Sequence, residues 1–251
     1  MCGRYTSVKS DDQVANELKA IDKLEGGAST PDYNVAPTDT VRIVVNRPLR
    51  DEAGARTGEP VRQLRAARWG LVPTWAKDVK MGGRLFNARS ESVATKPAFR
   101  SAYRSRRCLV PIDGWYEWRV VDTPNGPRKQ PFYMTAEDGH VLALAGLYEF
   151  WHDPADGDAP TLTSCTVLTT DSVGELTVVH DRQPLVLPST AWEQWLDPAV
   201  ADPADLLVAW DESAGETIEL RPVSTLVNSV RNDSPELVSR VEPVDDHETL
   251  F

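Results

Sequence analysis

The sequence has few cysteines, a minority of basic residues and no long apolar run, and each shortage excludes a class of protein. Its three cysteines in 251 residues form no CxxC pair, which argues against a disulfide framework or a zinc site. No stretch approaches the roughly 18 apolar residues of a membrane-spanning helix. The chain does not open with a basic segment followed by an apolar one, as a signal peptide would. We therefore expect a cytoplasmic, non-secreted protein without metal or membrane partner.

Basic residues are outnumbered: 38 acidic residues against 27 Lys and Arg give a net charge of −11. This balance is unusual for a protein that binds nucleic acid. Residues 84–107 depart from it, with seven basic residues and one acidic residue, Glu91, so that seven minus one leaves +6. The seven are Arg84, Arg89, Lys96, Arg100, Arg104, Arg106 and Arg107. Such a run is a solvated face or a phosphate-binding face, and composition leaves both open.

Short segments rich in Val, Leu, Ile and Thr, bounded by turn residues, predict a β-rich fold. The expected strands cover residues 40–46, 61–70, 108–112, 131–134, 140–150, 161–170 and 183–187. Helical spacing of apolar residues predicts helices at 11–21 and 191–196. Polar segments predict loops at 51–60, 121–130, 152–160 and 197–205. Because regular βαβ alternation is missing, we expect one compact α+β domain. Its mixed or antiparallel sheet would be curved or barrel-like, with a few peripheral helices.

Cys2 would become the N-terminal residue if Met1 were removed, as cells commonly do before a small second residue. It would then carry an α-amine with a pKa near ~7.7–8 and a thiol with a pKa near ~8.5, both partly nucleophilic at neutral pH. An amine and a thiol so placed condense with an aldehyde to a Schiff base and then a five-membered thiazolidine. A ring-opened abasic sugar in DNA is a suitable aldehyde. The alternative is N-terminal nucleophile hydrolysis of an amide by the thiol, and position alone does not decide between them.

Seven motifs in a fixed order make the sequence recognisable. They are MCGRY at the start, YNVAPT (33–38), WGLVPTWAKD (69–78), FNARSES (86–92), CLVPIDGWYEW (108–118), VVHDRQPLVL (178–187) and RPVSTLVNSVRND (221–233). Together they resemble the SRAP family, the SOS-response-associated peptidases understood as abasic-site processing proteins. The resemblance implies an SRAP domain over residues 2–233, followed by an acidic C-terminal tail over 234–251.

The resemblance implies that the catalytic residues are Cys2, Asn87, Glu117 and His180. Glu117 stands among aromatic residues in GWYEW, so desolvation should raise its pKa and let it exchange protons near neutrality. His180 titrates in the useful range and can protonate the sugar ring oxygen. Asn87 offers both a donor and an acceptor for positioning the reacting groups.

The same resemblance implies a DNA-binding set. Its members are Arg4, Asn34, Pro37, Trp75, Arg89, Trp118 and Arg182. The arginines would grip phosphates and the tryptophans would stack on bases, while Asn34 and Pro37 would shape the floor beneath Cys2. The chain departs from some relatives at Ala76, where they have a second aromatic residue, and at Pro97, where they have a basic one.

The implied function is a covalent thiazolidine crosslink between Cys2 and the ring-opened abasic sugar in single-stranded DNA at a fork or single-strand/double-strand junction, which would shield the lesion. Lyase activity and a self-processing peptidase activity would accompany it. No cofactor is implied, and the protein would act as a monomer that associates with the nucleoid when engaged on DNA. Two alternatives stay open, a thiol peptidase or amidase with Cys2 as N-terminal nucleophile and a non-catalytic reader of modified DNA bases.

Overall fold

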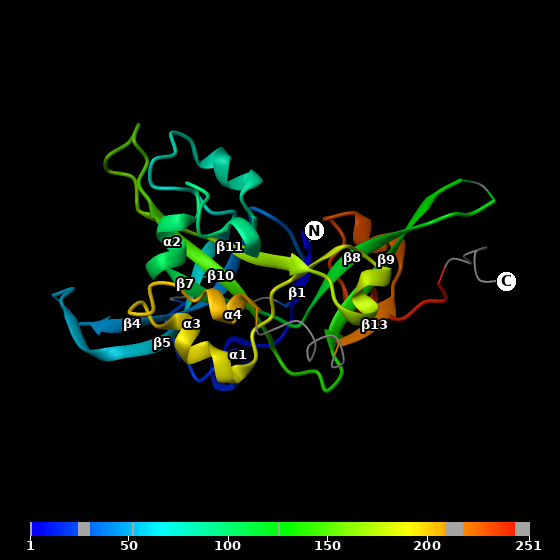
Figure 1. Cartoon of the computed structure of the whole chain (residues 1–251), viewed down its shortest axis with the longest axis horizontal. Coiled ribbons are helices and arrows are strands. Elements are labelled where there is room, and N and C mark those ends of the chain that lie inside the picture. Colours follow the sequence, from blue (N-terminus) through cyan, green and yellow to red (C-terminus); the bar gives the residue numbers. More distant parts are fainter. Residues whose placement is uncertain (1, 25–30, 52, 125, 209–217, 244–251) are drawn as a thin grey trace.

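The computed structural model of the chain describes residues 2–24, 31–51, 53–124, 126–208 and 218–243 (Figure 1). The strands are β1 (Tyr5–Ser7), β2 (Ile21–Asp22), β3 (Asp32–Val35), β4 (Thr40–Arg50), β5 (Arg56–Trp69), β6 (Asn87–Arg89), β7 (Arg107–Ile112), β8 (Gly114–Val121), β9 (Arg128–Ala136), β10 (Leu142–Trp151), β11 (Leu162–Asp171), β12 (Arg182–Pro184) and β13 (Ile218–Pro222). The α-helices are α1 (Asp11–Glu17), α2 (Arg100–Ser105), α3 (Trp192–Leu196) and α4 (Ala204–Val208). The 3-10 helices are η1 (Val79–Arg84), η2 (Ser90–Ser92), η3 (Gly174–Val178), η4 (Ser189–Ala191), η5 (Thr225–Asn228) and η6 (Pro235–Val238).

Five strands pair in a closed circuit. Antiparallel ladders join β5 to β4, β4 to β7, β7 to β10 and β10 to β11. A short parallel pairing of Ser164 and Cys165 in β11 with Arg68 and Trp69 in β5 closes the ring. Three further strands pair with members of this circuit: β2 with β5, and β6 and β12 with β11. This closed sheet, with its few short helices, confirms the predicted α+β domain with a barrel-like sheet.

A second sheet of five strands, in the order β13-β9-β8-β1-β3, lies beside the barrel (Figure 1). Its strand β1 lies between β8 and β3, with Tyr5 opposite Trp115 on one side and Val35 on the other. The Tyr5 ring packs 5.0 Å from the ring of Trp69, the last residue of β5 in the barrel. This aromatic contact joins the two sheets, so the beginning of the chain lies at their junction.

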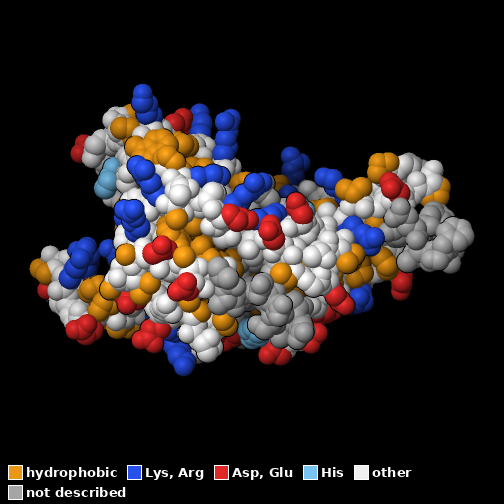
Figure 2. All heavy atoms as spheres, viewed as in Figure 1, with side chains coloured by type: hydrophobic (Ala, Val, Ile, Leu, Met, Phe, Trp, Pro, Cys, Tyr) orange, Lys and Arg blue, Asp and Glu red, His pale blue; other side chains and the backbone are white. Residues whose placement is uncertain are grey.

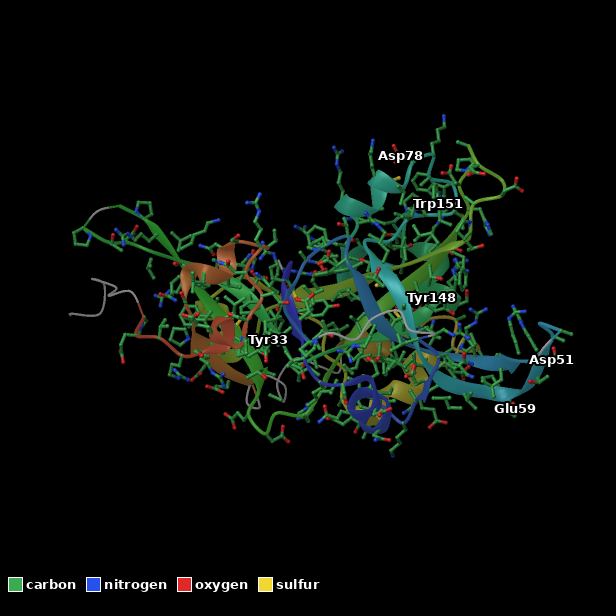
Figure 3. The ribbon with its side chains drawn as sticks, turned by 180° about the vertical axis from the view of Figure 1, so that it is seen from behind. Tyr33, Asp51, Glu59, Asp78, Tyr148 and Trp151 are labelled. Carbon is green, nitrogen blue, oxygen red and sulfur yellow. The ribbon has the colours of Figure 1, made fainter. Side chains whose placement is uncertain are left out.

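The predicted loop at 51–60 is wrong, because β4 and β5 continue on either side of a turn at residues 51–55. They form a two-stranded ribbon that projects from the barrel (Figure 1; Asp51 and Glu59 near its tip are labelled in Figure 3). Residues 56–60 are exposed on both faces, so the apolar alternation that signals a strand is missing. The loop expected at 121–130 is shortened in the same way, since β8 runs to Val121 and β9 begins at Arg128. Residues 52 and 125 lie outside the described part of the chain.

The first helix is shorter than the predicted 11–21. It begins with a capping box, in which Ser10 and Gln13 exchange side-chain bonds to each other's backbone N–H. It ends at Glu17 because Lys19 adopts a positive φ of 52°, which breaks the helical backbone. The expected apolar face is partly confirmed, since Val14 and Leu18 are buried whereas Ile21 begins β2 and is 44% exposed.

The segment after residue 233 contacts the second sheet. Leu237 is fully buried, Val223 and Arg240 form a β-bridge, and Arg240 pairs with Glu219 at 2.8 Å. Residues 244–251, the remainder of the expected acidic tail, lie outside the described residues. The domain boundary at 233 stays a prediction. No helix in the described part of the chain is long and apolar enough to cross a membrane.

Gly114 begins β8 where no side chain fits. A Cβ at this position would lie 2.4 Å from the Met134 carbonyl oxygen and 2.5 Å from the Tyr133 ring. We expect Gly114→Ala to destabilise the protein by about 1–3 kcal/mol through overpacking, measured by urea denaturation. Gly157→Ala is the matched control, because nothing lies within 4 Å of the Cβ that it adds. Equal unfolding midpoints for the two variants would contradict this account of β8.

Candidate active site

Cys2 lies just before β1, and its side chain is fully buried. The Asn87 side-chain Nδ2 donates to the Cys2 carbonyl oxygen at 2.7 Å. Two residues later, the Tyr116 N–H donates to the Arg4 carbonyl at 3.0 Å. Asn87 belongs to β6, which pairs with β11 of the barrel sheet, whereas Tyr116 belongs to β8 of the second sheet. The backbone of residues 2–4 is therefore held from both sheets.

Glu117 follows Tyr116 on β8 and is 3% exposed. Burial raises the pKa of Glu117, while the positive charges of the chain's N-terminus and of His180 oppose this rise. The direction is the one predicted from the aromatic surroundings of the residue. Charge interactions thus link Glu117 to both His180 and Cys2.

The Cys2 thiol differs from the sequence-based expectation of partial ionisation at neutral pH. Burial raises the pKa of the Cys2 thiol far above its ordinary value, and the negative charge of Glu117 raises it further. A thiolate would lose its hydration and be repelled by the negative charge of Glu117. The thiol is therefore protonated at neutral pH, and reaction at sulfur requires a base to accept its proton.

His180 follows η3, and its side chain is 29% exposed. Its Nδ1 accepts a bond from the Arg182 N–H at 2.9 Å and also lies 2.7 Å from Asp181 Oδ1. The amide contact requires a lone pair on Nδ1, whereas the carboxylate contact requires a proton there. The two contacts suit different tautomers of the ring, so the backbone of Arg182 and the side chain of Asp181 favour different positions of the ring proton.

Asn87 carries a buried side-chain oxygen, Oδ1, that has no hydrogen-bond partner among the described residues. Its nitrogen is occupied by the Cys2 carbonyl. A buried acceptor without a partner is uncommon and costs about 1–3 kcal/mol. The site thus offers an unused acceptor beside the residue predicted to react.

Arg4 and Asn34 are both engaged inside the protein. One Arg4 nitrogen, Nη1, donates to Asn34 Oδ1 at 2.7 Å and to the Val227 carbonyl at 2.9 Å. Asn34 is 3% exposed, and its Nδ2 donates to the Ser229 and Asn232 carbonyls at 2.9 and 2.8 Å. Both residues thus hold the backbone of residues 225–232, a role that the sequence reasoning did not anticipate. The only sequence feature that pointed to this segment was the motif at 221–233.

The other predicted DNA contacts differ in exposure. Trp75 is 56% exposed and Arg89 is exposed, whereas Pro37 and Trp118 are half-buried. The Trp118 Nε1 donates to Asn228 Oδ1 at 2.7 Å. Of this set, Trp75 and Arg89 have the most open side chains. The neighbouring Ala76 is 3% exposed and packs with Val72 and Trp151, which leaves no room for the second aromatic residue of some relatives.

Arg182 is 8% exposed and is surrounded by acceptors. Its guanidinium binds Glu91, Asp171 Oδ1 at 2.5 Å and the Thr169 carbonyl at 2.7 Å. In the structure it is an internal ion-pair residue whose backbone N–H holds His180.

The basic run at 84–107 divides into surface and interior. Arg84, Arg89, Lys96, Arg100 and Arg104 are exposed. Arg106 pairs with the buried Glu149 at 2.7 Å, and Arg107 is 4% exposed. Figure 2 shows Lys and Arg side chains along the upper edge of the molecule, with a small group of acidic side chains below them near the centre of the view. Acidic side chains are more frequent along the lower edge, so a local basic surface exists despite the negative net charge.

The raised pKa of Glu117 predicts a pH-dependent stability. The folded state holds the proton more tightly than the unfolded chain, whose carboxyl titrates near 4.5. The stability contribution is therefore complete below that pH and declines as the pH rises toward the folded pKa, by about 1.4 kcal/mol for each pH unit of difference. We expect Glu117→Gln to be more stable than wild type at pH 7 and equally stable at pH 4, in urea titrations. The exposed Glu137→Gln is the control, and a Glu117→Gln variant less stable at pH 7 would contradict the sign.

No group of three or more His, Cys, Asp or Glu side chains in the described part of the chain is arranged as metal ligands would be. Asn87, Glu117 and His180 all lie at least 85 residues after Cys2 in the sequence. The fold bonds Asn87 to Cys2 and brings Glu117 within range of charge interactions with Cys2 and His180.

Comparisons with known proteins agree with one another. The family profile described as "SOS response associated peptidase (SRAP)" matches residues 1–230. The chain is 35% identical to "Abasic site processing protein YoqW" of Bacillus subtilis, covering 95% of this chain and 99% of that protein. It is 30% identical to "Abasic site processing protein HMCES" of Xenopus tropicalis, covering 96% and 78%.

Solved structures show the same fold. A protein from Bacteroides thetaiotaomicron matches with a TM-score of 0.78 at 21% identity, covering 96% of this chain and 100% of that one. A phage-related protein from Bordetella bronchiseptica matches with a TM-score of 0.63 at 27% identity, covering 89% and 95%. The family profile spans most of the chain, and the relatives align over nearly its whole length. The chain therefore belongs to the SOS response associated peptidase (SRAP) family.

Proposed function

We propose that this protein processes abasic sites in DNA by forming a covalent thiazolidine between Cys2 and the ring-opened sugar. The observation that carries the proposal is the position of Cys2 at the junction of the two sheets. Its carbonyl accepts a hydrogen bond from Asn87, and its thiol interacts with the charge of Glu117. The names of the relatives, abasic site processing proteins, support DNA with abasic sites as the target.

The chemistry requires a free α-amine on Cys2, hence removal of Met1. The amine nitrogen attacks the aldehyde carbon, and the resulting carbinolamine loses water to give an imine. The thiol sulfur then bonds to the imine carbon, and its proton goes to the nitrogen. One water leaves overall, and carbon, nitrogen and sulfur close a five-membered ring without any oxidant or cofactor.

The raised pKa of the Cys2 thiol supports one order of these steps, because a protonated thiol is a poor first nucleophile. The amine attacks first, and Glu117 accepts and returns the protons that the water loss and ring closure require. His180 protonates the sugar ring oxygen during ring opening. Asn87 Oδ1, which lacks a partner among the described residues, accepts a bond from the Cys2 amine and aims its lone pair at the aldehyde.

Two activities accompany this scheme in the proposal. A lyase reaction follows if a proton is lost from the carbon next to the imine, whereupon the 3′ carbon–oxygen bond breaks and the phosphate leaves. Self-processing consumes one water to hydrolyse the Met1–Cys2 peptide bond. The target is single-stranded DNA at a fork or junction, bound by a monomer. A lesion without a base requires no base to be flipped out of the stack.

The alternatives have less physical support. A thiol peptidase attacks with sulfur first and therefore needs a thiolate at the outset, whereas burial and Glu117 both disfavour the Cys2 thiolate. In the proposed scheme sulfur reacts only after the imine has formed, and the self-processing step is hydrolysis by water. If the protein only bound modified bases, the hydrogen bond of Cys2 with Asn87 and its charge interaction with Glu117 would have no role.

The test incubates wild-type protein with a single-stranded oligonucleotide containing one abasic site, beside the undamaged oligonucleotide, on a denaturing gel. We expect a shifted band with the abasic strand only, whose mass equals protein lacking Met1 plus oligonucleotide minus one water. Peptide cleavage without any band would replace the proposal by the peptidase. A covalent adduct on protein that retains Met1 would overturn the role of the amine.

A further inference from the structure

We propose that residues 225–232, the wall loop, form a rigid DNA-binding surface whose side chains Leu226 and Val230 cover the base next to the abasic nucleotide. This inference deepens the proposed function and rests on it. It assigns recognition of the lesion's neighbour to a segment for which the sequence motifs suggested no contact.

The wall loop is held from several sides. Arg4 Nη1 donates to the Val227 carbonyl at 2.9 Å, and Asn34 Nδ2 donates to the Ser229 and Asn232 carbonyls at 2.9 and 2.8 Å. Trp118 Nε1 donates to Asn228 Oδ1 at 2.7 Å. Within the loop, Asn232 Nδ2 donates to the Leu226 carbonyl at 2.7 Å.

Two large apolar side chains of the wall loop are exposed to solvent although its backbone is held by these hydrogen bonds. Leu226 is 42% exposed and Val230 is 57% exposed, whereas Val227 between them is fully buried. Arg231 beside them is exposed and adds a positive charge suited to a phosphate. A surface fixed in this way loses little conformational entropy when a ligand binds, which favours a binding role over chance exposure.

The wall loop is connected to the reactive end of the chain. Arg4, two residues after Cys2, reaches Val227, and Trp118, next to Glu117 on β8, reaches Asn228. Trp118 follows Glu117 directly on β8, so the anchor of the loop is the chain neighbour of the carboxyl of the site. The bond from Arg4 places the loop beside the beginning of the chain, and Figures 1 and 3 show the orange segment after residue 217 next to the blue N-terminal segment.

The chemistry of an abasic strand matches this surface. Loss of a base removes a stacking partner, so the neighbouring base exposes one apolar ring face to water. Leucine and valine side chains can cover that face without reading its sequence, and Arg231 can bind the adjoining phosphate. Apolar side chains on a loop that is bonded to Arg4, two residues from Cys2, therefore fit a flanking base in single-stranded DNA.

The test compares wild type with Leu226→Ala/Val230→Ala, and with the control Ile21→Ala, which removes a 44% exposed side chain on β2. Binding is measured by fluorescence anisotropy with an oligonucleotide carrying a tetrahydrofuran abasic analogue, which has no aldehyde. We expect the double variant to bind about 5- to 10-fold more weakly, in the range of one lost base contact, and Ile21→Ala to bind as wild type does.

A second measurement separates this inference from the proposed chemistry. Adduct formation with 2-deoxyribose 5-phosphate, an aldehyde sugar without neighbouring bases, should be equal in wild type and the double variant. Unchanged binding of the analogue by the double variant would overturn the wall-loop proposal, even if the adduct forms. Weaker binding without any adduct in wild type would leave the loop as a DNA contact and refute the crosslink instead.

Discussion

Cys2→Ser is expected to abolish the stable adduct with abasic DNA, lowering its yield at least about 100-fold, while a Schiff base can still be trapped by borohydride. The physical reason is that serine keeps the α-amine but replaces the sulfur that closes the ring. Cys2→Ala should show the same loss of stable adduct, because its amine also remains. The measurement is a denaturing gel of protein and abasic oligonucleotide, run with and without borohydride.

The control is Cys165→Ala, which removes another fully buried thiol. It should form the adduct at the wild-type level once folding is confirmed. A stable adduct with Cys2→Ser at the wild-type yield would show that sulfur is not part of the linkage. Loss of borohydride trapping in both Cys2 variants would show instead that the position acts through more than its side chain.

Arg107→Met is expected to cost the fold about 3–5 kcal/mol, because Arg107 is a buried cation that holds several carbonyls. Its guanidinium donates to the carbonyls of Trp195 at 2.5 Å, Tyr103 at 2.7 Å and Val200 at 2.9 Å, among others. Methionine fills similar space but leaves these acceptors without partners. Urea denaturation followed by tryptophan fluorescence measures the change.

Arg104→Met is the matched control, since Arg104 belongs to the same basic run and its side chain is exposed. Its stability should stay within about 0.5 kcal/mol of wild type. If both variants lost the same stability, the interior role of Arg107 would be contradicted. If Arg107→Met were stable but bound DNA poorly, this arginine would belong to the binding surface after all.

The sequence of the basic run does not show which of its residues are exposed and which are buried. From the order of residues, Arg84 and Arg107 are equivalent members of one positive segment. The fold exposes the first and buries the second among backbone carbonyls. Arg107 is buried because α3 and the following turn, about 90 residues later in the chain, place the carbonyls of Trp195 and Asp197 around its guanidinium. No pattern in the sequence near Arg107 contains that information.

The β-strands show the same division. The barrel strands predicted at 108–112, 140–150 and 161–170 lie close to their observed limits, because buried strands are locally apolar. Residues 56–60 of β5 are exposed on both faces at the tip of the ribbon, so pairing with β4, and not an apolar pattern within the strand, makes this segment part of the sheet.

The sequence by itself determined that Cys2 can present an amine and a thiol on one residue, that Glu117 stands among aromatic residues, and that the motifs are those of the SRAP family. These properties are local, or are read from the order of motifs. Only the tertiary structure decided that the Cys2 thiol is held protonated and that Arg4 and Asn34 support the wall loop. A pKa and a hydrogen bond depend on distances between groups far apart in the chain, and folding alone sets those distances.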